Sequence, residues 1–301
     1  MNSLSRRRFL VQSGLAALAS AWMPRLALAD PLGGPIGVQL YAVREILNED
    51  PAGTLKKLKE IGFGEVETAG FGKLTAKEFR RLLDDNGLAC PSAHLPFDAD
   101  KIAQSLEDAQ TLGASYAVTG SLRSLATDDK GSPIEWKTDM GADEAKRTAE
   151  LANRLGEQAK RAGLQFAYHN HNQEFADLGD GTIGFDLLLR HTDPDLVKFQ
   201  IDCGWMVLGG RDPVDYFKKY PNRFPSIHVK DFQPASASDG GSKEEPRGAE
   251  LGHGIIDYRP IFAAAKQAGL KHYFVEQEGP FERMDQMQAA KVAYDYLHAI
   301  D

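Results

Sequence analysis

Residues 58–68, Leu-Lys-Glu-Ile-Gly-Phe-Gly-Glu-Val-Glu-Thr, contain the pattern that decides the fold. The end of an amphipathic helix leads to Gly62, and the short run Glu65–Thr68 that follows is typical of a buried strand. Glycine just past a helix end takes the left-handed conformation at no steric cost. The segment therefore predicts a helix, a stop and a strand, in that order.

The same order recurs along the chain, with helix ends predicted at Gly87, Gly113, Gly163 and Gly269. The first two intervals between these glycines and Gly62 are 25 and 26 residues, which fits one strand–helix unit each. The third interval is 50 residues and indicates one unit with a long insertion. The eight expected strands are residues 36–41, 65–68, 88–92, 116–119, 164–168, 197–202, 226–229 and 272–276.

Strands that alternate with helices predict a parallel sheet. Helix starts agree with this division, because Asp50-Pro51 and Thr75–Glu78 are typical N-terminal caps. Eight units in about 270 residues favour a single α/β domain, a (β/α)₈ TIM barrel over residues 30–301. A doubly wound sheet is the alternative, but no G-x-G-x-x-G motif follows an early strand.

The first 29 residues resemble an export signal. Ser5–Leu10 contains paired arginines followed by Phe-Leu, a short apolar stretch comes next, and Ala27-Leu28-Ala29 supplies a cleavage site. This pattern predicts a twin-arginine signal peptide over residues 1–29, with the export machinery as a partner and a periplasmic location. Pro24 and the shortness of the apolar stretch argue against a permanent membrane anchor.

Composition excludes several classes of protein. Two cysteines cannot build a disulfide framework, and no apolar run is long enough to span a membrane. Removing residues 1–29 takes away four arginines and no acids, which changes the formal charge from −8 to −12. Nucleic acid is therefore not an expected partner. A protein that folds before export can acquire a metal in the cytoplasm, so a metal site is worth seeking.

In a TIM barrel the functional groups lie where strands end. Polar residues follow the predicted strands in succession, and burying several like charges together is costly unless a cation compensates them. Carboxylates with an imidazole suit one divalent metal ion, Mn²⁺, Mg²⁺ or Co²⁺, with Zn²⁺ also possible. The residues concerned are His94, His169, His171, Glu174, Asp202, Trp205, His228, Lys230, Glu276 and Glu278.

Over residues 35–300 the sequence resembles the sugar isomerase/epimerase superfamily, whose members have a xylose-isomerase-like barrel. The resemblance implies a divalent metal held by Glu, Asp, His and Glu from strands five to eight. The motifs that carry it are Tyr168–His171 with Glu174-Phe175, Ile201-Asp202 with Trp205, His228–Asp231, Gly252–Asp257 and Val275-Glu276.

By this resemblance Asp202, His228 and Glu276 are three of the metal ligands. The fourth departs from the commonest pattern, because Tyr168 is expected where the family carries a Glu. We expect Glu174, six residues later, to be the fourth ligand, with His171 as the fallback.

The remaining roles also follow from the resemblance. The base that moves a proton is expected to be His171 or an outer oxygen of Glu276, unless Glu174 is itself the base. Lys230 is expected either to stabilise a developing oxyanion or to pair with Asp231. The candidate substrate-binding residues are His94, Trp205 and Arg247. A strand-end hydrogen bond is the alternative for His94, and a solvated loop charge is the alternative for Arg247.

The resemblance implies proton abstraction next to a carbonyl, through a metal-stabilised enediolate. The main expectation is an isomerase or epimerase acting on an unphosphorylated sugar or keto-sugar, as a monomer or homodimer. A 3-keto-glycoside lyase or hydratase using the same site is the alternative. A phosphodiesterase of the endonuclease type and a non-catalytic periplasmic sugar-binding protein are weaker candidates.

Overall fold

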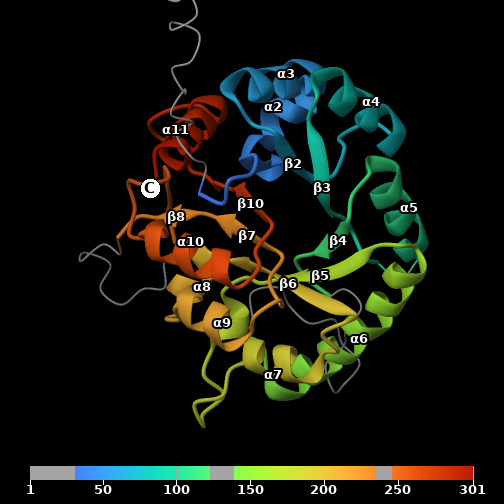
Figure 1. The fold of residues 1–301 in the computed structure, drawn as a ribbon, viewed down its shortest axis with the longest axis vertical. Coiled ribbons are helices and arrows are strands. Elements are labelled where there is room, and N and C mark those ends of the chain that lie inside the picture. Colours follow the sequence, from blue (N-terminus) through green and yellow to red (C-terminus); the bar gives the residue numbers. More distant parts are fainter. Residues whose placement is uncertain (1–30, 99, 123–138, 235–245, 301) are drawn as a thin grey trace, which may run out of the picture.

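A closed ring of parallel strands forms the centre of the molecule, and helices surround it (Figure 1). The computed structural model describes residues 31–98, 100–122, 139–234 and 246–300. The order around the ring is β1-β10-β7-β6-β5-β4-β3-β2, which confirms the predicted TIM barrel. The ring strands are β1 (Gly37–Gln39), β2 (Glu65–Ala69), β3 (Ala89–His94), β4 (Tyr116–Thr119), β5 (Gln165–His169), β6 (Val197–Asp202), β7 (Ser226–Val229) and β10 (His272–Val275).

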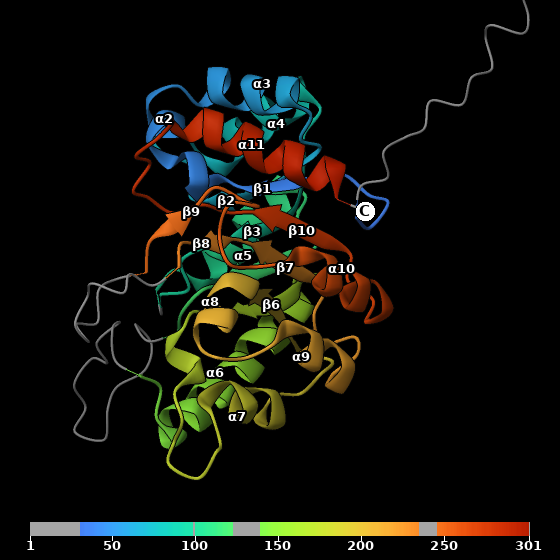
Figure 2. The ribbon, with the colours of Figure 1, turned by 90° about the vertical axis from the view of Figure 1, so that its left-hand side faces the viewer.

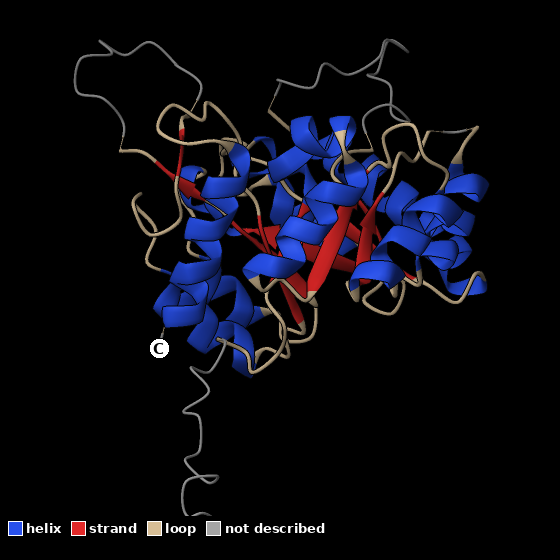
Figure 3. Cartoon of the chain, turned by 90° about the horizontal axis from the view of Figure 1, so that it is seen from above, coloured by secondary structure: helices blue, strands red, loops and turns tan. Residues whose placement is uncertain are grey.

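The helices lie outside the strands, and Figure 3 shows this arrangement with helices in blue and strands in red. The last helix, α11, lies beside α3 and so brings the end of the barrel against its beginning (Figures 1 and 2). The helices are η1 (Leu40–Val43), α2 (Arg44–Glu49), α3 (Pro51–Ile61), α4 (Ala76–Asn86), α5 (Ile102–Leu112), α6 (Ala142–Arg161), η3 (Gln173–Phe175), α7 (Gly184–His191), α8 (Cys203–Leu208), α9 (Pro213–Lys219), α10 (Tyr258–Gln267) and α11 (Gln286–Ala299).

The local signals in the sequence fold as predicted. Asp50 caps α3 by accepting a hydrogen bond from Gly53 N, and Thr75 with Glu78 forms a capping box at α4. Gly87 and Gly113 end α4 and α5 in the left-handed conformation, with φ of 60° and 76°. Gly87 and Gly113 therefore stop α4 and α5 shortly before β3 and β4 begin.

Five strands end at a residue other than the predicted one: β2 ends one residue later and β10 one residue earlier. The other three are β1, β3 and β5. Residues 40–43 form the 3₁₀-helix η1 in place of the end of the first strand. Strand β3 continues to His94, and β5 runs one residue further than predicted, to His169. The change in β5 matters most, because neighbouring residues of a strand point to opposite faces.

Inside the barrel, side chains from every second strand position form a buried polar layer. Glu67, Ser92, Gln200 and His228 belong to it, and all four are fully buried. The apolar core lies instead between the strands and the helices, where Phe199 of β6 contacts Phe185 of α7 at a ring distance of 5.4 Å. The polar interior opens at the carboxyl ends of the strands.

A small hairpin, β8 (Asp231–Phe232) with β9 (Gly248–Ala249), follows β7 at that end. The buried Asp231 carboxylate accepts hydrogen bonds from the backbone N–H groups of Gly252, Gly254 and Ile256. Asp231 therefore organises the loop before α10, and it makes no ion pair with Lys230 among the described contacts.

Replacing Asp231 by Ala should lower the free energy of unfolding by about 2–4 kcal/mol, because four backbone donors, of which those of Phe232 and Ile256 are buried, lose their acceptor. Asp231→Asn keeps one carbonyl acceptor and should cost clearly less. Urea unfolding of both variants measures the difference. Equal stability of Asp231→Ala and the unchanged protein would show that the loop does not depend on this carboxylate.

Some predictions concern residues outside the described ranges. The export signal at residues 1–29 and most of the insertion between Gly120 and Gly141 belong to this group. They stay predictions. Within the described residues no helix has the length and apolar character needed to cross a membrane.

Candidate metal centre

Four side chains from four neighbouring strands meet at the carboxyl end of the barrel. His169, Asp202, His228 and Glu276 each offer one ligand atom, and these atoms all lie within 4.8 Å of one another. Asp202 and His228 are paired in the parallel register of β6 and β7, and Glu276 follows β10 directly. The predicted convergence of Asp202, His228 and Glu276 is therefore confirmed, and His169 is an addition to it.

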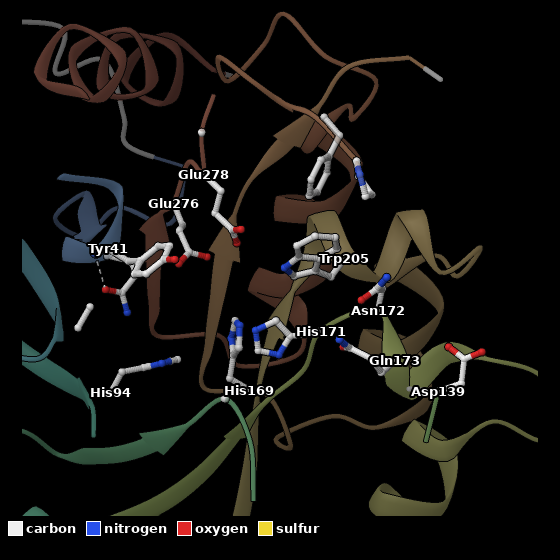
Figure 4. A pocket seen from close by; sticks show the side chains of 16 residues that line it. Tyr41, His94, Asp139, His169, His171, Asn172, Gln173, Trp205, Glu276 and Glu278 are labelled. Carbon is white, nitrogen blue, oxygen red and sulfur yellow. Dashed lines mark hydrogen bonds between the residues drawn. The ribbon is translucent and has the colours of Figure 1, made fainter. Parts of the chain in front are cut away.

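Two members of the group, His169 and Glu276, line a cavity of about 850 Å³. Figure 4 shows Glu276 and Glu278 approaching the centre of this cavity from above, and His169 and His171 from below. His94 and Trp205 also line it, together with Gln39, Tyr41, Ala69, Gly120, Asp139, Asn172, Gln173, Phe232, Pro246 and Gly279.

Glu67 connects the cluster to the polar layer beneath it. Its carboxylate accepts hydrogen bonds from Gln39 Nε2 at 2.8 Å, from Gln200 Nε2 at 2.7 Å, and from the Ser92 hydroxyl. His228 Nε2 lies 2.5 Å from Glu67 Oε2. Because a carboxylate accepts, His228 Nε2 must carry the hydrogen, and Nδ1 faces Glu276 and Asp202 at 3.1 and 4.0 Å.

Gln200 fixes the orientation of His169 in the same way. Its amide nitrogen donates to Glu67, so its oxygen Oε1 faces the imidazoles. This oxygen lies 3.1 Å from His169 Nδ1 and 2.8 Å from His94 Nε2. Both nitrogens therefore carry hydrogens, which leaves the lone pair of His169 Nε2 facing Asp202 Oδ2 at 4.0 Å.

Buried charges hold this network together. Burial raises the pKa of Glu67, but the charges of His94 and His228 and the hydrogen bonds from His228 and Ser92 lower it to about 2. Burial lowers the pKa of His228, but Glu276 and Glu67 on its two sides raise it to about 10. Without a metal, His228 is therefore an imidazolium between two carboxylates at neutral pH.

The residues fit a divalent metal. Asp202 Oδ2 is buried and has no hydrogen-bond partner among the described residues, and its contacts with Lys230, His169 and His228 are ion-pair distances of 3.1–4.0 Å. Two carboxylate oxygens and two imidazole nitrogens face one point. Compared with the expected three carboxylates and one imidazole, this donor set shifts the preference from Mg²⁺ towards Mn²⁺, Co²⁺ or Zn²⁺.

Glu174 does not join this group among the described residues. Its carboxylate accepts hydrogen bonds from the Tyr168 hydroxyl at 2.7 Å and from His171 N at 2.9 Å. Tyr168 packs against Phe199 on the helix side of the strand, because its neighbour His169 faces the interior. The inward position at the end of β5 is thus His169. Glu174 as a metal ligand stays a prediction that this geometry does not support.

His171 and Trp205 occupy the places expected of residues that touch a substrate. Burial, and then the charge of Lys230, lower the pKa of His171 to about 3, so its imidazole is neutral. The Trp205 indole N–H is buried and has no hydrogen-bond partner among the described residues. His94 lines the cavity while Gln200 holds its Nε2.

Arg247 lies outside the cavity. Its guanidinium pairs with Glu282 on the surface, and its side chain is about half exposed. It is not among the cavity-lining residues of the described structure. Its expected contact with a substrate therefore finds no support in the geometry, because its charge is already compensated outside the cavity.

Comparison with known proteins agrees with this architecture. The sequence pattern of a family described as "Xylose isomerase-like TIM barrel" matches residues 55–299. A solved sugar phosphate isomerase/epimerase from Parabacteroides distasonis is 29% identical, with a TM-score of 0.68 over 88% of this chain and 93% of that one. A xylose isomerase-like barrel from Mycobacterium smegmatis, solved in complex with magnesium, shares the fold at 20% identity and a TM-score of 0.62, over 88% of this chain and 95% of that one.

Curated relatives carry a more specific name. An inosose dehydratase of Lacticaseibacillus casei is 32% identical over 196 residues, which is 61% of this chain and 61% of the relative. The match thus spans about three fifths of that protein's length. Dehydratases are lyases, so these relatives agree better with the lyase alternative than with an isomerase or epimerase.

Proposed function

This chain belongs to the family of xylose isomerase-like TIM barrels, and from that premise we propose that it is a divalent-metal-dependent lyase that eliminates a β-oxygen substituent from an unphosphorylated polyhydroxylated ketone. The substrate class includes inososes, which would lose water, and 3-keto-glycosides, which would lose the aglycone as an alcohol. The observation that carries the proposal is the group of His169, Asp202, His228 and Glu276, of which His169 and Glu276 line the cavity.

The lining of the cavity supports an uncharged substrate. Among the described lining residues there is no Arg or Lys, whereas Asp139, Glu276 and Glu278 are acidic. A phosphate dianion needs charge-assisted donors and would be repelled here. The same lining is unfavourable for a nucleic-acid backbone, so a phosphodiesterase is not supported.

Elimination requires a proton acceptor, an acid and a fixed carbonyl. A divalent metal, when bound by the four ligands, would supply Lewis-acid polarisation of that carbonyl. The neutral His171 imidazole would take the proton from the carbon next to the carbonyl and return it to the departing hydroxyl. Trp205 would donate its unpaired indole N–H to a substrate hydroxyl.

An isomerase or epimerase would begin with the same proton abstraction. The two activities diverge afterwards, when a β-hydroxyl leaves or when the proton returns to carbon. The inosose dehydratase relatives support loss of the β-hydroxyl. A binding protein without activity would not need a neutral, buried base beside a carboxylate-rich cluster.

The test is incubation of the metal-loaded protein with inosose and 3-keto-glycosides in D₂O, each beside its phosphorylated counterpart. We expect loss of water from the inosose and release of the aglycone alcohol from the 3-keto-glycosides, both seen as enone absorbance. His171→Ala should keep its metal and lose this step. Deuterium incorporation without water loss would favour the isomerase. No exchange and no elimination across the panel, with metal bound, would refute the proposal.

A further inference from the structure

Lys230 places a buried ammonium group against the candidate metal centre. The side chain is 1% exposed, and its Nζ lies 2.7 Å from Glu276 Oε2, 3.1 Å from Asp202 Oδ2 and 2.6 Å from Glu278 Oε1. The Trp205 ring covers it at 5.1 Å. Three carboxylates from two segments of the chain, the end of β6 and the segment after β10, therefore converge on one resident cation.

Two of these oxygens are also the ones that face the imidazole ligands. Asp202 Oδ2 lies 4.0 Å from both His169 Nε2 and His228 Nδ1, and Glu276 Oε2 lies 3.1 Å from His228 Nδ1. A metal ion bonds such donors at about 2.0–2.3 Å. An ion held there and the ammonium would share the same two oxygens, so the two cations must repel each other at short range in a dry site.

We propose that Lys230 is a resident counter-cation that competes with the divalent metal for Asp202 and Glu276, and that Glu278 holds the ammonium when the metal is bound. The inference rests on the metal centre of the proposed function. It assigns to Lys230 control of metal affinity, which differs from the oxyanion role expected from the family resemblance.

Only the side chain of Lys230, and not its backbone, can move between these carboxylates. Tyr258 fixes the Lys230 backbone on both sides, since its hydroxyl donates to Lys230 O at 2.7 Å and accepts from Lys230 N at 2.8 Å. Glu278 differs from the other two carboxylates in exposure, with 37% of its side chain exposed against 9% for Glu276 and none for Asp202. Its carboxylate can therefore follow the ammonium.

The experiment measures Mn²⁺ affinity by calorimetry on the chelator-treated full-length protein. Lys230→Met removes the charge with little change in volume, and Lys230→Gln is a second neutral variant in case the first does not fold. Lys198→Met is the matched control, because Lys198 is partly buried and its one hydrogen bond among the described residues goes to Asn222 O. We expect both Lys230 variants to bind Mn²⁺ at least about tenfold more tightly, because a like charge is gone, while Lys198→Met binds as the unchanged protein does.

A second readout is thermal stability. Without metal, Lys230→Met should melt at a lower temperature than the unchanged protein, because its carboxylates lose their only resident ammonium among the described residues. Added Mn²⁺ should then raise the melting temperature more in the variant than in the unchanged protein. A melting temperature that is unchanged without metal would overturn the inference.

Glu278 is tested by a double-mutant cycle. Glu278→Gln alone should weaken Mn²⁺ binding, because the Lys230 ammonium loses the carboxylate that holds it when the metal occupies Asp202 and Glu276. In the Lys230→Met background the same change should have a smaller effect, and equal effects in both backgrounds would overturn the role of Glu278. If the unchanged protein binds Mn²⁺ and Lys230→Met binds it no more tightly, this inference fails alone. If neither binds a divalent ion, the metal centre of the proposed function fails with it.

Discussion

Replacing His169 by Ala should weaken divalent-metal binding by more than about a hundredfold, whereas Glu174→Gln should leave the metal in place. Loss of a residue that only supports a ligand typically costs 10–100-fold in affinity, so loss of a ligand itself should cost more. His169 Nε2 belongs to the group whose donor atoms lie within 4.8 Å. The Glu174 carboxylate is already engaged by Tyr168 and by His171 N.

The comparison is made by metal analysis and calorimetry on purified proteins. Asp202→Asn is the positive control, because it removes the charge of a carboxylate that both candidate sets include. Glu174→Gln keeps an oxygen acceptor for the His171 backbone, so the fold around it should persist. Metal loss in Glu174→Gln with full occupancy in His169→Ala would restore Glu174 as the ligand.

The two residues also differ in what else they control. Glu174 holds the backbone of His171 through a 2.9 Å hydrogen bond, so the weaker, uncharged acceptor of Glu174→Gln should hold His171 less firmly and slow the proton-transfer step. That effect would appear in turnover at full metal occupancy. Turnover and metal content therefore separate a residue that positions the base from one that binds the ion.

The architecture was predictable because its signals are local. Gly87 and Gly113 end helices whatever the rest of the chain does, and Thr75 with Glu78 caps a helix within four residues. Strand ends such as Asp202 and His228 could be placed because a barrel aligns all its strands in one direction. Asp202 and His228 lie close together because the strands close into one barrel.

His169 was named among the polar residues at the strand ends but not as a ligand, because its place in the cluster depends on one residue of strand register. The predicted strand ended at Tyr168, and a shift of one residue exchanges the inward and outward faces. Strand alternation combined with the inward position of Gln200, which pairs with His169 in register, would have identified it. The pairing of Lys230 with Glu278 joins residues 48 positions apart, and no local pattern encodes it.

Metal affinity should rise about tenfold for each pH unit between pH 6 and pH 8, a total of about a hundredfold, because one proton leaves His228 when the metal binds. The flanking carboxylates Glu276 and Glu67 raise the pKa of His228 to about 10 against the effect of burial. In the metal-free protein both ring nitrogens therefore carry hydrogens throughout this range. A ligand nitrogen must offer its lone pair, so Nδ1 has to lose its proton to the solvent.

Calorimetry in buffers of different ionisation enthalpy measures the number of protons released, which should be close to one at pH 7. The pH dependence of the stability of the metal-free protein is an independent check that His228 is protonated in it. Because the folded-state pKa of His228 lies above its unfolded value, its contribution to stability is complete below about pH 6.5 and is lost as the pH rises towards 10. Chelated protein should therefore lose stability over that interval, whereas metal-loaded protein should not show this loss. Metal affinity that does not change between pH 6 and pH 8 would mean that His228 is already neutral without metal, and that the two carboxylates beside it do not hold its proton.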